Sequence, residues 1–494
     1  MPPVRWTVVN PLPQVPLSAV ADAVRRAEIR GDAAVQIREV AFDSRQVPTG
    51  ALFFCVPGAN IDGHGYARDA IRAGAVALVV ERWLDLDVPQ VRVRSVRQAM
   101  GPMSSVVFDE PSRSLTVVGV TGTNGKTTVV HLLDAVLRAA GHRTGAIGTV
   151  GAHVGAELLA LSRTTPEGPD LVRLLARMRD VGISAVAMEV SSHALDLGRV
   201  GGVRFDAAVF TNLSQDHLDH HGTMERYFEA KASLFTEERT DRAVVNLDDR
   251  WGRSLLDVAV PLTTYGLDPA ADVRGEDVRT TPEGLSFRVD GHEVRSPLRG
   301  AFNVSNTLAT FAAARAVGLD DGPILRGLAA AEQVPGRMEP IEAGQDFLVV
   351  VDYAHTPDSI RTVLAAARPL ATGRVIVVFG CGGDRDRAKR SPMGAAATEG
   401  ADLTVITTDN PRSEEPSEII AEVERGAAAG GGAFVVEPDR RAAIRRALRE
   451  ARSGDVVVVA GRGHEAVQEV GDRLLPFDDR VVVREELDVI GGAA

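Results

Sequence analysis

The sequence predicts an α/β protein of three domains, and three observations lead to this prediction. Short apolar runs recur along the chain and each leads into a polar cluster, which is typical of strands in parallel sheets covered by helices. One of these runs opens into a glycine-rich loop that ends in GKTT. The chain has 494 residues, which is enough for two to four domains that each bury a core.

The composition is that of an ordinary soluble protein, with 45% hydrophobic and 25% charged residues. The net charge of -12 argues against non-specific binding of nucleic acid. The two cysteines, Cys55 and Cys381, exclude a disulfide framework and indicate a reducing compartment. No apolar run approaches the ~18 residues of a membrane span, and the N-terminus lacks the apolar region of a signal peptide. We therefore expect a cytoplasmic protein.

Residues 1–112 are predicted to form a small N-terminal α/β domain. Prolines, glycines and aspartates divide residues 41–67 into short strands and tight turns. This pattern fits an ordinary small domain as well as a binding module. The segment FDEPSRS, residues 108–114, is expected to lead into the next domain.

Residues 113–338 are predicted to form a central domain around a doubly wound, mostly parallel sheet. In LTVVGVTGTNGKTT, residues 115–128, a buried strand leads into a glycine loop, and apolar residues then recur at helical spacing up to Gly141. Such a loop cradles phosphate with backbone N–H groups and the helix N-terminus, while Lys126 reaches the outer phosphates and a threonine can ligate Mg²⁺. Val120 stands where the strict P-loop pattern has glycine. We favour a nucleotide phosphate site over a plain glycine-rich turn.

Three further strands of this domain are expected within residues 183–190, 205–210 and 243–245, and each precedes a polar cluster. Ligands of such sheets bind beyond the carboxyl ends of the strands, so these clusters should lie beside Lys126. Glu189, at the end of an apolar strand, is interpreted as a Mg²⁺ ligand because an isolated carboxylate there would be costly. His217 and His221 have a spacing that zinc can use, but no third ligand follows at motif spacing, and a shared Mg²⁺ and phosphate site is favoured. Residues 285–294 should form a hairpin that turns at Asp-Gly.

Residues 339–494 are predicted to form a second doubly wound sheet. Strands are expected at residues 348–351, 375–379, 403–406, 434–436 and 456–459, with helices such as residues 442–451 between them. Four of these strands lead into DYAHTPDS, GCGGDRDRAKR, TTDNPRSEEP and GRGHE. One pocket should therefore be lined by Arg385, Asp409, Asn410, Arg412 and Glu465. GCGGDRD does not match GxGxxG, so a dinucleotide site is not favoured.

Four further residues have interpretations that the residues alone do not decide. Lys231, in YFEAKASLF, fits an ordinary amphipathic helix with its ammonium group in solvent. Arg337, in PGRMEP, and Asp352 and His355, just past a strand end, fit either a ribose or phosphate contact across domains or a surface salt bridge.

The ordered set TGTNGKTT, TTPE, EVSSHAL, NLSQDHLDHHG, EAKASLF, FNVSN, GRME, DYAHTPDS, GCGGDRDR, DNPR and GRGHE resembles the Mur ligases of peptidoglycan synthesis. The resemblance spans about residues 42–469, and it is strongest to the branch that adds the third residue of the stem peptide. It implies an N-terminal domain for the UDP-sugar, a central ATPase and a C-terminal Rossmann-like domain for the incoming amino acid. GxxGxxGKT is the usual form of the loop in this family.

The resemblance also implies a set of site residues. ATP would be bound by Gly122, Thr123, Asn124, Gly125, Lys126, Thr127, Thr128, Asn306, Arg337 and Asp352. The UDP-sugar dipeptide would be bound by Phe42, Ser44, Ala59, Asn60, Ile61, Thr164, Thr165, Ser191 and Arg199. meso-Diaminopimelate would be bound by Arg385, Asp409, Asn410, Pro411, Arg412, Gly461 and Glu465. Mg²⁺ would be organised by Thr127, Glu189, His217 and Lys231, the lysine as a carbamate. Lys126, Lys231, His217 and Glu189 would form the catalytic set. Leu197 departs from the pattern, because a close relative has glutamine there.

The activity that the resemblance implies is ATP-dependent amide formation through an acyl phosphate, with meso-diaminopimelate as the amine, in peptidoglycan precursor synthesis and hence in cell-wall formation, cell shape and division. Arg412 favours diaminopimelate over lysine because a guanidinium can grip the second carboxylate with two hydrogen bonds. Only small-molecule partners, no membrane insertion and a monomer are expected.

Three alternatives stay open at this point. A ligase of the same family with another substrate, including the folylpolyglutamate branch, would share the ATP motifs but not the N-terminal DSR segment and DNPR. A P-loop ATPase or GTPase switch would need neither the GRGHE loop nor Lys231. A non-catalytic UDP-sugar-binding protein would not need the ATP motifs.

Overall fold

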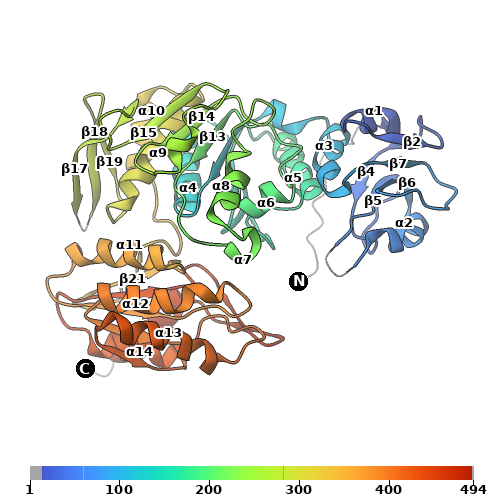
Figure 1. Ribbon diagram of the computed structural model, residues 1–494. Coiled ribbons are helices and arrows are strands. Elements are labelled where there is room, and N and C mark those ends of the chain that lie inside the picture. Colours follow the sequence, from blue (N-terminus) through green and yellow to red (C-terminus); the bar gives the residue numbers. More distant parts are fainter. Residues whose placement is uncertain (1–13, 59–60, 282, 492–494) are drawn as a thin grey trace.

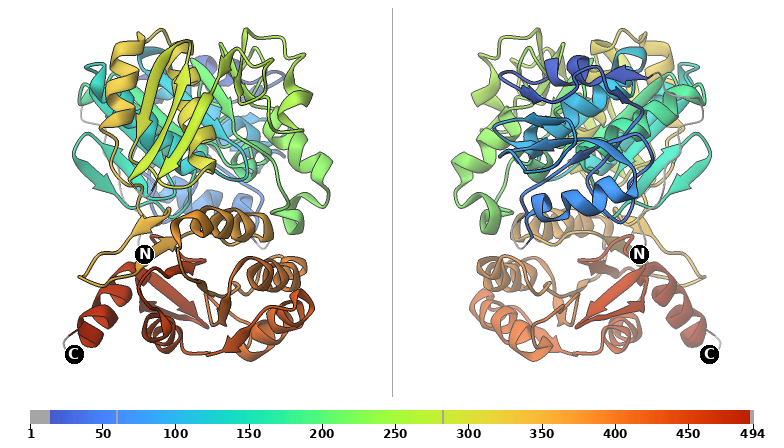
Figure 2. Two further views of the ribbon diagram at one scale, coloured as in Figure 1. Left: turned by 90° about the vertical axis from the view of Figure 1, so that its left-hand side faces the viewer. Right: turned by 90° about the vertical axis from the view of Figure 1, so that its right-hand side faces the viewer.

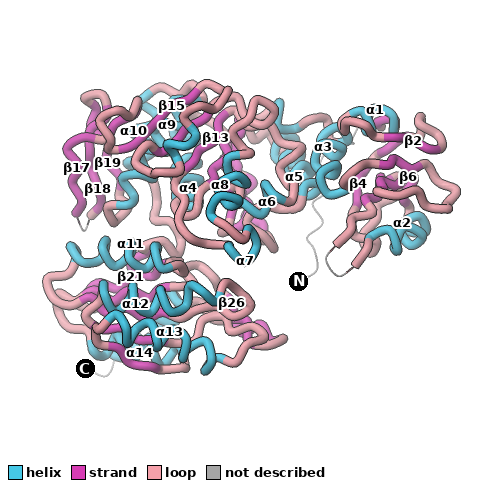
Figure 3. Tube along the Cα trace, viewed as in Figure 1, coloured by secondary structure: helices cyan, strands magenta, loops and turns pink. Residues whose placement is uncertain are grey.

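The computed structural model of the protein describes residues 14–58, 61–281 and 283–491 and contains three large sheets that follow one another along the chain (Figure 1). The N-terminal sheet lies to one side of the central sheet, and the C-terminal sheet with its helices lies beneath the central body (Figures 1 and 2). Helices cover strands throughout (Figure 3). The predicted α/β class is confirmed.

The N-terminal sheet has five strands in the order β2-β7-β6-β5-β4, and only β2 runs antiparallel to its neighbour. Phe53 and Phe54 are buried on its two faces, since successive side chains of a strand point to opposite sides. Its strands are β2 (Glu28–Arg30), β4 (Glu39–Ala41), β5 (Ala51–Phe54), β6 (Ala75–Val80) and β7 (Gln90–Arg92). A separate ribbon pairs β1 (Val15–Pro16) with β3 (Gln36–Ile37), and the helices are α1 (Leu17–Asp22), α2 (Ala67–Ala73) and α3 (Val96–Val107).

The central sheet has nine strands in the order β11-β10-β9-β12-β8-β13-β14-β15-β16, and it is parallel from β9 to β16. An antiparallel hairpin, β10–β11, closes one edge. The three strands expected after the glycine loop are present. The first two are shorter than the apolar runs that predicted them, and the third extends one residue further, to Asn246. The strands are β8 (Thr116–Thr121), β9 (Thr144–Gly148), β10 (Gly151–Val154), β11 (Glu157–Leu159), β12 (Ala185–Glu189), β13 (Ala207–Phe210), β14 (Ala243–Asn246), β15 (Leu262–Gly266) and β16 (Val273–Arg274).

Helices cover both faces of the central sheet, which explains why its strands read as continuous apolar runs. One core lies under α4 (Lys126–Ala139), α9 (Phe302–Ala316) and α10 (Asp321–Ala329). The other core lies under α5 (Gly168–Asp180) and α8 (Met224–Ala232), with the short α6 (Ser192–Asp196) and α7 (Leu218–His221) beside them.

A three-stranded antiparallel sheet packs on α9 and α10 through residues such as Phe287 and Val294. The predicted hairpin is confirmed within it. Asp290 and Gly291 form the turn with φ of 48° and 82°, the positive values that a type I′ turn requires. The strands are β17 (Glu276–Thr281), β18 (Gly284–Val289) and β19 (His292–Ser296).

The C-terminal sheet has six strands in the order β20-β21-β25-β22-β23-β24, and all but β20 are parallel. All five strands predicted here are present. The strands are β20 (Glu339–Pro340), β21 (Leu348–Asp352), β22 (Val375–Phe379), β23 (Leu403–Ile406), β24 (Phe434–Val436) and β25 (Val456–Ala460). The helices are α11 (Pro357–Ala367), α12 (Arg390–Gly400), α13 (Pro416–Gly430), α14 (Arg440–Glu450) and α15 (Asp479–Gly491). A separate hairpin joins β26 (Val467–Val470) to β27 (Arg473–Pro476).

The predicted domain boundaries fall in connections between these sheets. The first lies between α3 and β8, where residues Pro111–Ser114 form a short 3₁₀ turn. The second lies between α10 and β20. As domain limits, 112/113 and 338/339 stay predictions. No helix in the described part of the chain combines the length and the apolar character needed to cross a membrane.

Candidate active site

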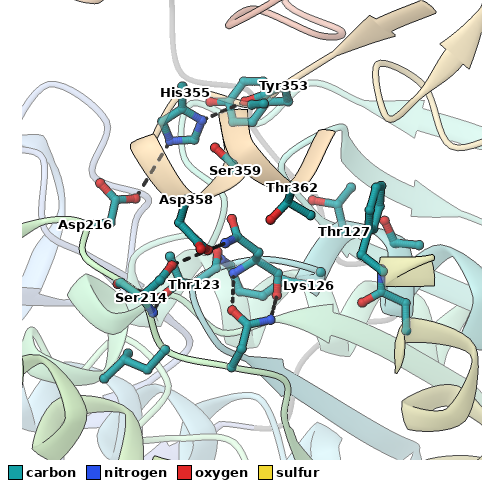
Figure 4. A pocket seen from close by; sticks show the side chains of 18 of the residues that line it. Thr123, Lys126, Thr127, Ser214, Asp216, Tyr353, His355, Asp358, Ser359 and Thr362 are labelled. Atoms are coloured by element: carbon teal, nitrogen blue, oxygen red, sulfur yellow. Dashed lines mark hydrogen bonds and ion pairs between the residues drawn. The ribbon is translucent and has the colours of Figure 1, made fainter. Parts of the chain in front are cut away.

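A cavity of about 500 Å³ lies where the carboxyl ends of β8, β12 and β13 face the segment that follows β21. Residues 123–128 and Glu189 line it from the central sheet, and residues 352–355 line it from the C-terminal sheet. Figure 4 shows Lys126 and Thr127 on one side, with Tyr353, His355 and Asp358 facing them. Parallel α/β sheets bind ligands at this kind of edge, here with two sheets contributing.

The glycine loop needs glycine at two positions. Gly122 has φ 148°, and a Cβ there would lie 1.9 Å from Thr211 Oγ1. Gly125 has φ 87°, and a Cβ there would lie 2.3 Å from Asn306 Oδ1. Val120, by contrast, lies inside β8 opposite Glu189 and is fully buried. The departure from the strict P-loop pattern therefore falls in the strand and leaves the loop unaffected.

Lys126 begins α4 and folds back over the loop. Its Nζ donates to Gly122 O at 2.9 Å and to Thr123 O at 2.8 Å. Removal from water lowers the pKa of Lys126, and the Glu189 carboxylate opposes that shift. Both of these partners are backbone carbonyls, and the side chain lines the cavity, where a phosphate could contact it.

Glu189 and Thr127 form an oxygen-rich corner beside the loop. Glu189 is 1% exposed, and its Oε1 accepts hydrogen bonds from Thr127 Oγ1 at 3.0 Å and from Thr149 N at 2.8 Å. Hard oxygen donors of this kind suit Mg²⁺, which takes one or two protein carboxylates and completes its shell with phosphate and water. No group of three or more His, Cys, Asp and Glu side chains in the described ranges is placed to hold a metal ion. Thr127 and Glu189 could supply two of the oxygen ligands of such an ion.

His217 precedes α7 with a left-handed backbone, φ 54°, which is uncommon for a residue other than glycine. Burial lowers its pKa to about 3, so its imidazole is neutral at pH 7 and keeps a lone pair for a metal or hydrogen bond. His221 is directed elsewhere, because its Nε2 lies 3.0 Å from Ser192 Oγ and its ring stacks on Tyr227.

Lys231 is 1% exposed, so the interpretation as a solvated helix lysine is wrong. Its Nζ donates to Gly122 O at 2.8 Å and lies 4.7 Å from the centroid of the Tyr227 ring. Burial, reinforced by Lys126, lowers the pKa of Lys231 well below its ordinary value. Burial therefore favours loss of the ammonium proton at this position beside the phosphate loop.

Arg337, Asp352 and Asn306 all line the same cavity. Arg337 Nη2 donates to Thr127 Oγ1 at 3.0 Å, and its guanidinium lies 4.5 Å from the centroid of the Tyr353 ring. Asp352 accepts from the backbone N of Met338 at 2.7 Å. Both charged side chains therefore lie where the two sheets face each other, and their contact to a nucleotide stays a prediction.

The residues that the resemblance assigns to the UDP-sugar dipeptide fall into two groups. Thr164 and Ser191 line the cavity, and Thr165 Oγ1 donates to Glu189 O at 2.9 Å. Arg199 is buried and pairs with Glu167 at 3.1 Å. Outside the cavity lining, on the N-terminal sheet and its loops, lie Phe42, Ser44 and Ile61. Ala59 and Asn60 lie outside the described residues. Leu197 follows α6, close to Ser191 in the chain.

The residues assigned to diaminopimelate gather at the edge of the six-stranded sheet. Asn410 Nδ2 donates to Glu465 Oε2 at 2.9 Å, and a Cβ on Gly461 would lie 2.6 Å from Asp409 Oδ2. A Cβ on Gly382 would lie 3.0 Å from Arg412 Nη1 and 3.9 Å from Arg385 Cγ. Pro411 lies between Asn410 and Arg412 in the same segment. Tyr353 OH donates to Glu465 Oε1 at 3.2 Å, which joins this cluster to the cavity.

Two contacts bridge the two sheets. His355, which the sequence placed just past a strand end, has its Nε2 3.8 Å from Asp216 Oδ2, and Asn124 Nδ2 donates to Asp358 Oδ2 at 3.3 Å. Asp358 was not singled out from the sequence, although the position of DYAHTPDS at a strand end was an available signal for it. The roles of Tyr227 and Thr149 had no sequence signal, because they act through contacts with residues distant in the chain.

Comparisons with known proteins give one family over most of the chain. Residues 36–105 match the family model "Mur ligase family, catalytic domain", residues 120–314 match "Mur ligase middle domain", and residues 336–463 match "Mur ligase, glutamate ligase domain".

Sequences and solved structures that are similar to this chain also carry the names of ligases. The UDP-N-acetylmuramoyl-L-alanyl-D-glutamate--2,6-diaminopimelate ligase of Geobacillus thermodenitrificans is 47% identical over 454 residues, covering 90% of this chain and 93% of the relative. The enzyme of the same name from Streptomyces avermitilis is 44% identical over 494 residues, covering 97% of each. A solved structure of a ligase with this name is 33% identical, with a TM-score of 0.70 over 97% of this chain and 99% of that chain. MurF ligase from Thermotoga maritima, solved in complex with ADP, has a TM-score of 0.60 at 20% identity and covers 91% of this chain and 96% of that chain, so it shares the fold.

Proposed function

The chain belongs to the Mur ligase family of ATP-dependent ligases, and from this premise we propose that it joins meso-diaminopimelate to the D-glutamate side-chain carboxylate of UDP-N-acetylmuramoyl-L-alanyl-D-glutamate in peptidoglycan precursor synthesis. One observation carries the proposal. A phosphate loop with Lys126 and a cluster with Arg385 and Arg412 lie on facing sheet edges, joined through Tyr353.

The reaction would begin at the phosphate loop. Backbone N–H groups of residues 122–128 would hold the ATP phosphates, with Lys126 on the outer ones and with Asn306, Arg337 and Asp352 on the adenosine or phosphates. An oxygen of the glutamate carboxylate attacks the γ-phosphorus, the bond to the β-γ bridging oxygen breaks, and ADP leaves. The product is an acyl phosphate. Fixed positive charge at this point stabilises the charge that develops on the transferring group.

The second step would take place between the sheets. The diaminopimelate amine attacks the acyl carbon and inorganic phosphate leaves, with loss of the amine proton, to form the amide. Because no side chain serves as a covalent nucleophile, the protein contributes mainly by holding carboxylate, phosphate and amine together. His355 and Asp358 of the C-terminal region already contact Asp216 and Asn124, so closing the third domain over the substrates would extend an existing interface.

The metal that the family implies fits this chain. Thr127 Oγ1 and Glu189 Oε1 are 3.0 Å apart beside the loop, and His217 is neutral at pH 7. Mg²⁺ would be held by Thr127, Glu189, His217 and a carbamate on Lys231, and when bound it would offset the charge of the phosphate oxygens.

Carbamylation of Lys231 is supported by its burial. The lowered pKa favours the unprotonated amine, whose nitrogen can attack the carbon of CO₂ and release a proton, which gives an anionic carbamate. The amine next to the loop would then be replaced by a metal-facing anion.

We also propose the limits 1–112, 113–338 and 339–494 for a UDP-sugar domain, an ATPase domain and an amino-acid domain. We further propose a monomer as the active unit. Both cysteines are free and buried, which supports a reducing, cytoplasmic environment.

The test is amide formation from ATP and the UDP-sugar dipeptide with meso-diaminopimelate, L-lysine or L-ornithine as the amine. We expect ADP, phosphate and product only when meso-diaminopimelate is present. Phosphate release that did not depend on the added diamino acid would contradict the proposal. Equal use of lysine would contradict the role given to Arg412.

A further inference from the structure

The hairpin β26–β27 holds the DNPR segment through its backbone and side chains. Gln468 Nε2 donates to Asp409 O at 2.6 Å, and Glu469 N donates to Asn410 Oδ1 at 2.9 Å. Arg412 N donates to Glu469 O at 3.1 Å, and Gly471 N donates to Arg412 O at 2.8 Å. The hairpin forms its own two-stranded sheet, so it acts as a support placed against this segment.

Arg412 needs that support because its backbone is held in an unfavourable region. Its φ is 51°, in the left-handed region, which a residue with a Cβ adopts only when its surroundings impose it. The two backbone hydrogen bonds to the hairpin flank this residue. The direction of the Arg412 side chain is therefore set by the hairpin.

The guanidinium of Arg412 is also oriented by the hairpin. Its Nε donates to Glu469 Oε2 at 2.7 Å, and its Nη1 donates to Gly383 O at 2.7 Å. Within the described chain no hydrogen-bond partner is recorded for Nη2. A guanidinium can grip a carboxylate through the Nε–Nη2 edge or the Nη1–Nη2 edge. Glu469 occupies Nε, and Gly383 O takes one of the two N–H groups of Nη1. The other Nη1 N–H and the N–H groups of Nη2 remain for a ligand.

We propose that Glu469 is a positioning residue that fixes the Arg412 guanidinium for the second carboxylate of the diamino acid, and so contributes to acceptor selectivity. This inference rests on the proposed function. Glu469 lies beyond residues 336–463, the part matched by the glutamate ligase domain, and it has no place in the residue set implied by the family resemblance. Its carboxylate is 44% exposed, so it is not required to fill the core.

The first test compares Glu469→Ala and Glu469→Gln with the wild type in steady-state assays. We expect Glu469→Ala to raise the KM for meso-diaminopimelate about fivefold, the size expected for a half-exposed ion pair, with kcat and the KM for ATP and the UDP-sugar dipeptide unchanged. Glu469→Gln keeps an acceptor oxygen within reach of Nε and should show a smaller rise. The control is Glu293→Ala, which removes a comparable exposed ion pair, 2.9 Å from Arg295, in the three-stranded sheet, and it should behave as wild type.

The second test adds Glu469→Ala to Arg412→Ala. If Glu469 acts through Arg412, the second substitution has no further effect on the KM for meso-diaminopimelate. An equal effect in both backgrounds would mean that Glu469 touches the substrate directly and would overturn the inference. So would an unchanged KM in Glu469→Ala, or a uniform loss for all three substrates together with a lower melting temperature.

The assay of the wild type distinguishes a failure of the proposed function from a failure of the role given to Glu469. A wild type that uses meso-diaminopimelate, with Glu469 variants that do not differ from it, overturns only the role of Glu469. A wild type that does not use meso-diaminopimelate overturns the proposed function and this inference together.

Discussion

At the edge of the nine-stranded sheet, Lys126 and Lys231 both donate to one carbonyl, Gly122 O, and neither faces a carboxylate at hydrogen-bond distance in the described chain. At the edge of the six-stranded sheet, two arginines are paired with carboxylates. Arg412 faces Glu469 at 2.7 Å, and the fully buried Arg390 faces Glu414 at 2.7 Å.

The difference indicates how each edge selects its ligand. A buried amine without a counter-ion is costly to protonate, and a polyanion such as a nucleotide triphosphate lowers that cost when it binds. The charge of a guanidinium that already pairs with a carboxylate is compensated, so the arrival of a ligand changes its free energy little. Because the pairing also fixes its direction, such a guanidinium selects ligands by their geometry. The first edge is suited to capture phosphate, and the second edge is suited to choose an amine.

The largest effect is expected at the unpaired edge. Lys126→Ala should lower kcat by about 10²- to 10³-fold, the loss usual when one preorganised charge is removed from a transition state. The measurement is phosphate release with all three substrates present. Lys126→Arg, which keeps the charge but changes its shape, should recover only part of the rate. Full activity in Lys126→Ala would mean that the loop is not a catalytic phosphate site.

Lys231 allows a second test at the same edge, because this buried lysine should lower the free energy of unfolding and yet be needed for activity. Lys231→Met should abolish amide formation yet raise the free energy of unfolding by about 1–2 kcal/mol at pH 7 in CO₂-free buffer, as an apolar group replaces a buried amine. Gly122 O keeps its bond from Lys126, so no acceptor is orphaned. Denaturant unfolding and the ligase assay measure the two effects.

The pH dependence of that stability difference follows from the direction of the pKa shift. The folded-state pKa of Lys231 lies below the ordinary 10.5, so the unfolded chain binds more protons between the two values and wild-type stability rises with pH across that window. The advantage of Lys231→Met should therefore shrink as the pH is raised from 7 toward 10. An advantage that grew with pH would contradict the burial of a neutral amine.

A smaller effect is expected at the paired edge. Arg412→Lys should lower the ratio of kcat/KM for meso-diaminopimelate to that for L-lysine about tenfold, because an ammonium cannot form the two parallel hydrogen bonds of a guanidinium. The rate of ATP-dependent activation should be unaffected. A variant that lost rate equally with both amines would place Arg412 in the chemistry common to them.

The smallest effect is expected where the two edges touch. Asp358→Ala removes the acceptor of Asn124 Nδ2 at 3.3 Å, a long and exposed contact. The change in kcat should stay within about threefold, the equivalent of a weak surface hydrogen bond. A much larger loss, measured under the same conditions, would show that this contact limits closure of the third domain.

Much of the fold was accessible from the sequence because buried parallel strands are continuous apolar runs. The strand-end rule also brought Lys126 and Glu189 to one cavity and Asn410 and Glu465 to one cluster. The turn at Asp290 and Gly291 followed from local chemistry alone.

Other features depend on contacts that no local pattern encodes. A lysine in an amphipathic helix gives no sign of whether it faces a neighbouring loop, and for this reason the burial of Lys231 was open until the structure showed it. The separation of Phe42 and Ser44 from the cavity reflects how the N-terminal sheet sits beside the central one, which strand periodicity does not determine. Glu469 had no motif, since it acts through a hairpin outside the main sheet.

The hairpin β26–β27 also affects how the amine specificity of such an enzyme can change in evolution. It is joined to the DNPR segment but takes no place in the six-stranded sheet, so its sequence and length can change without disturbing a core strand. Altering the hairpin would re-aim Arg412 while every residue of the phosphate loop stayed the same. A lineage could therefore acquire a new amine substrate through this surface ribbon and inherit the ATP chemistry intact.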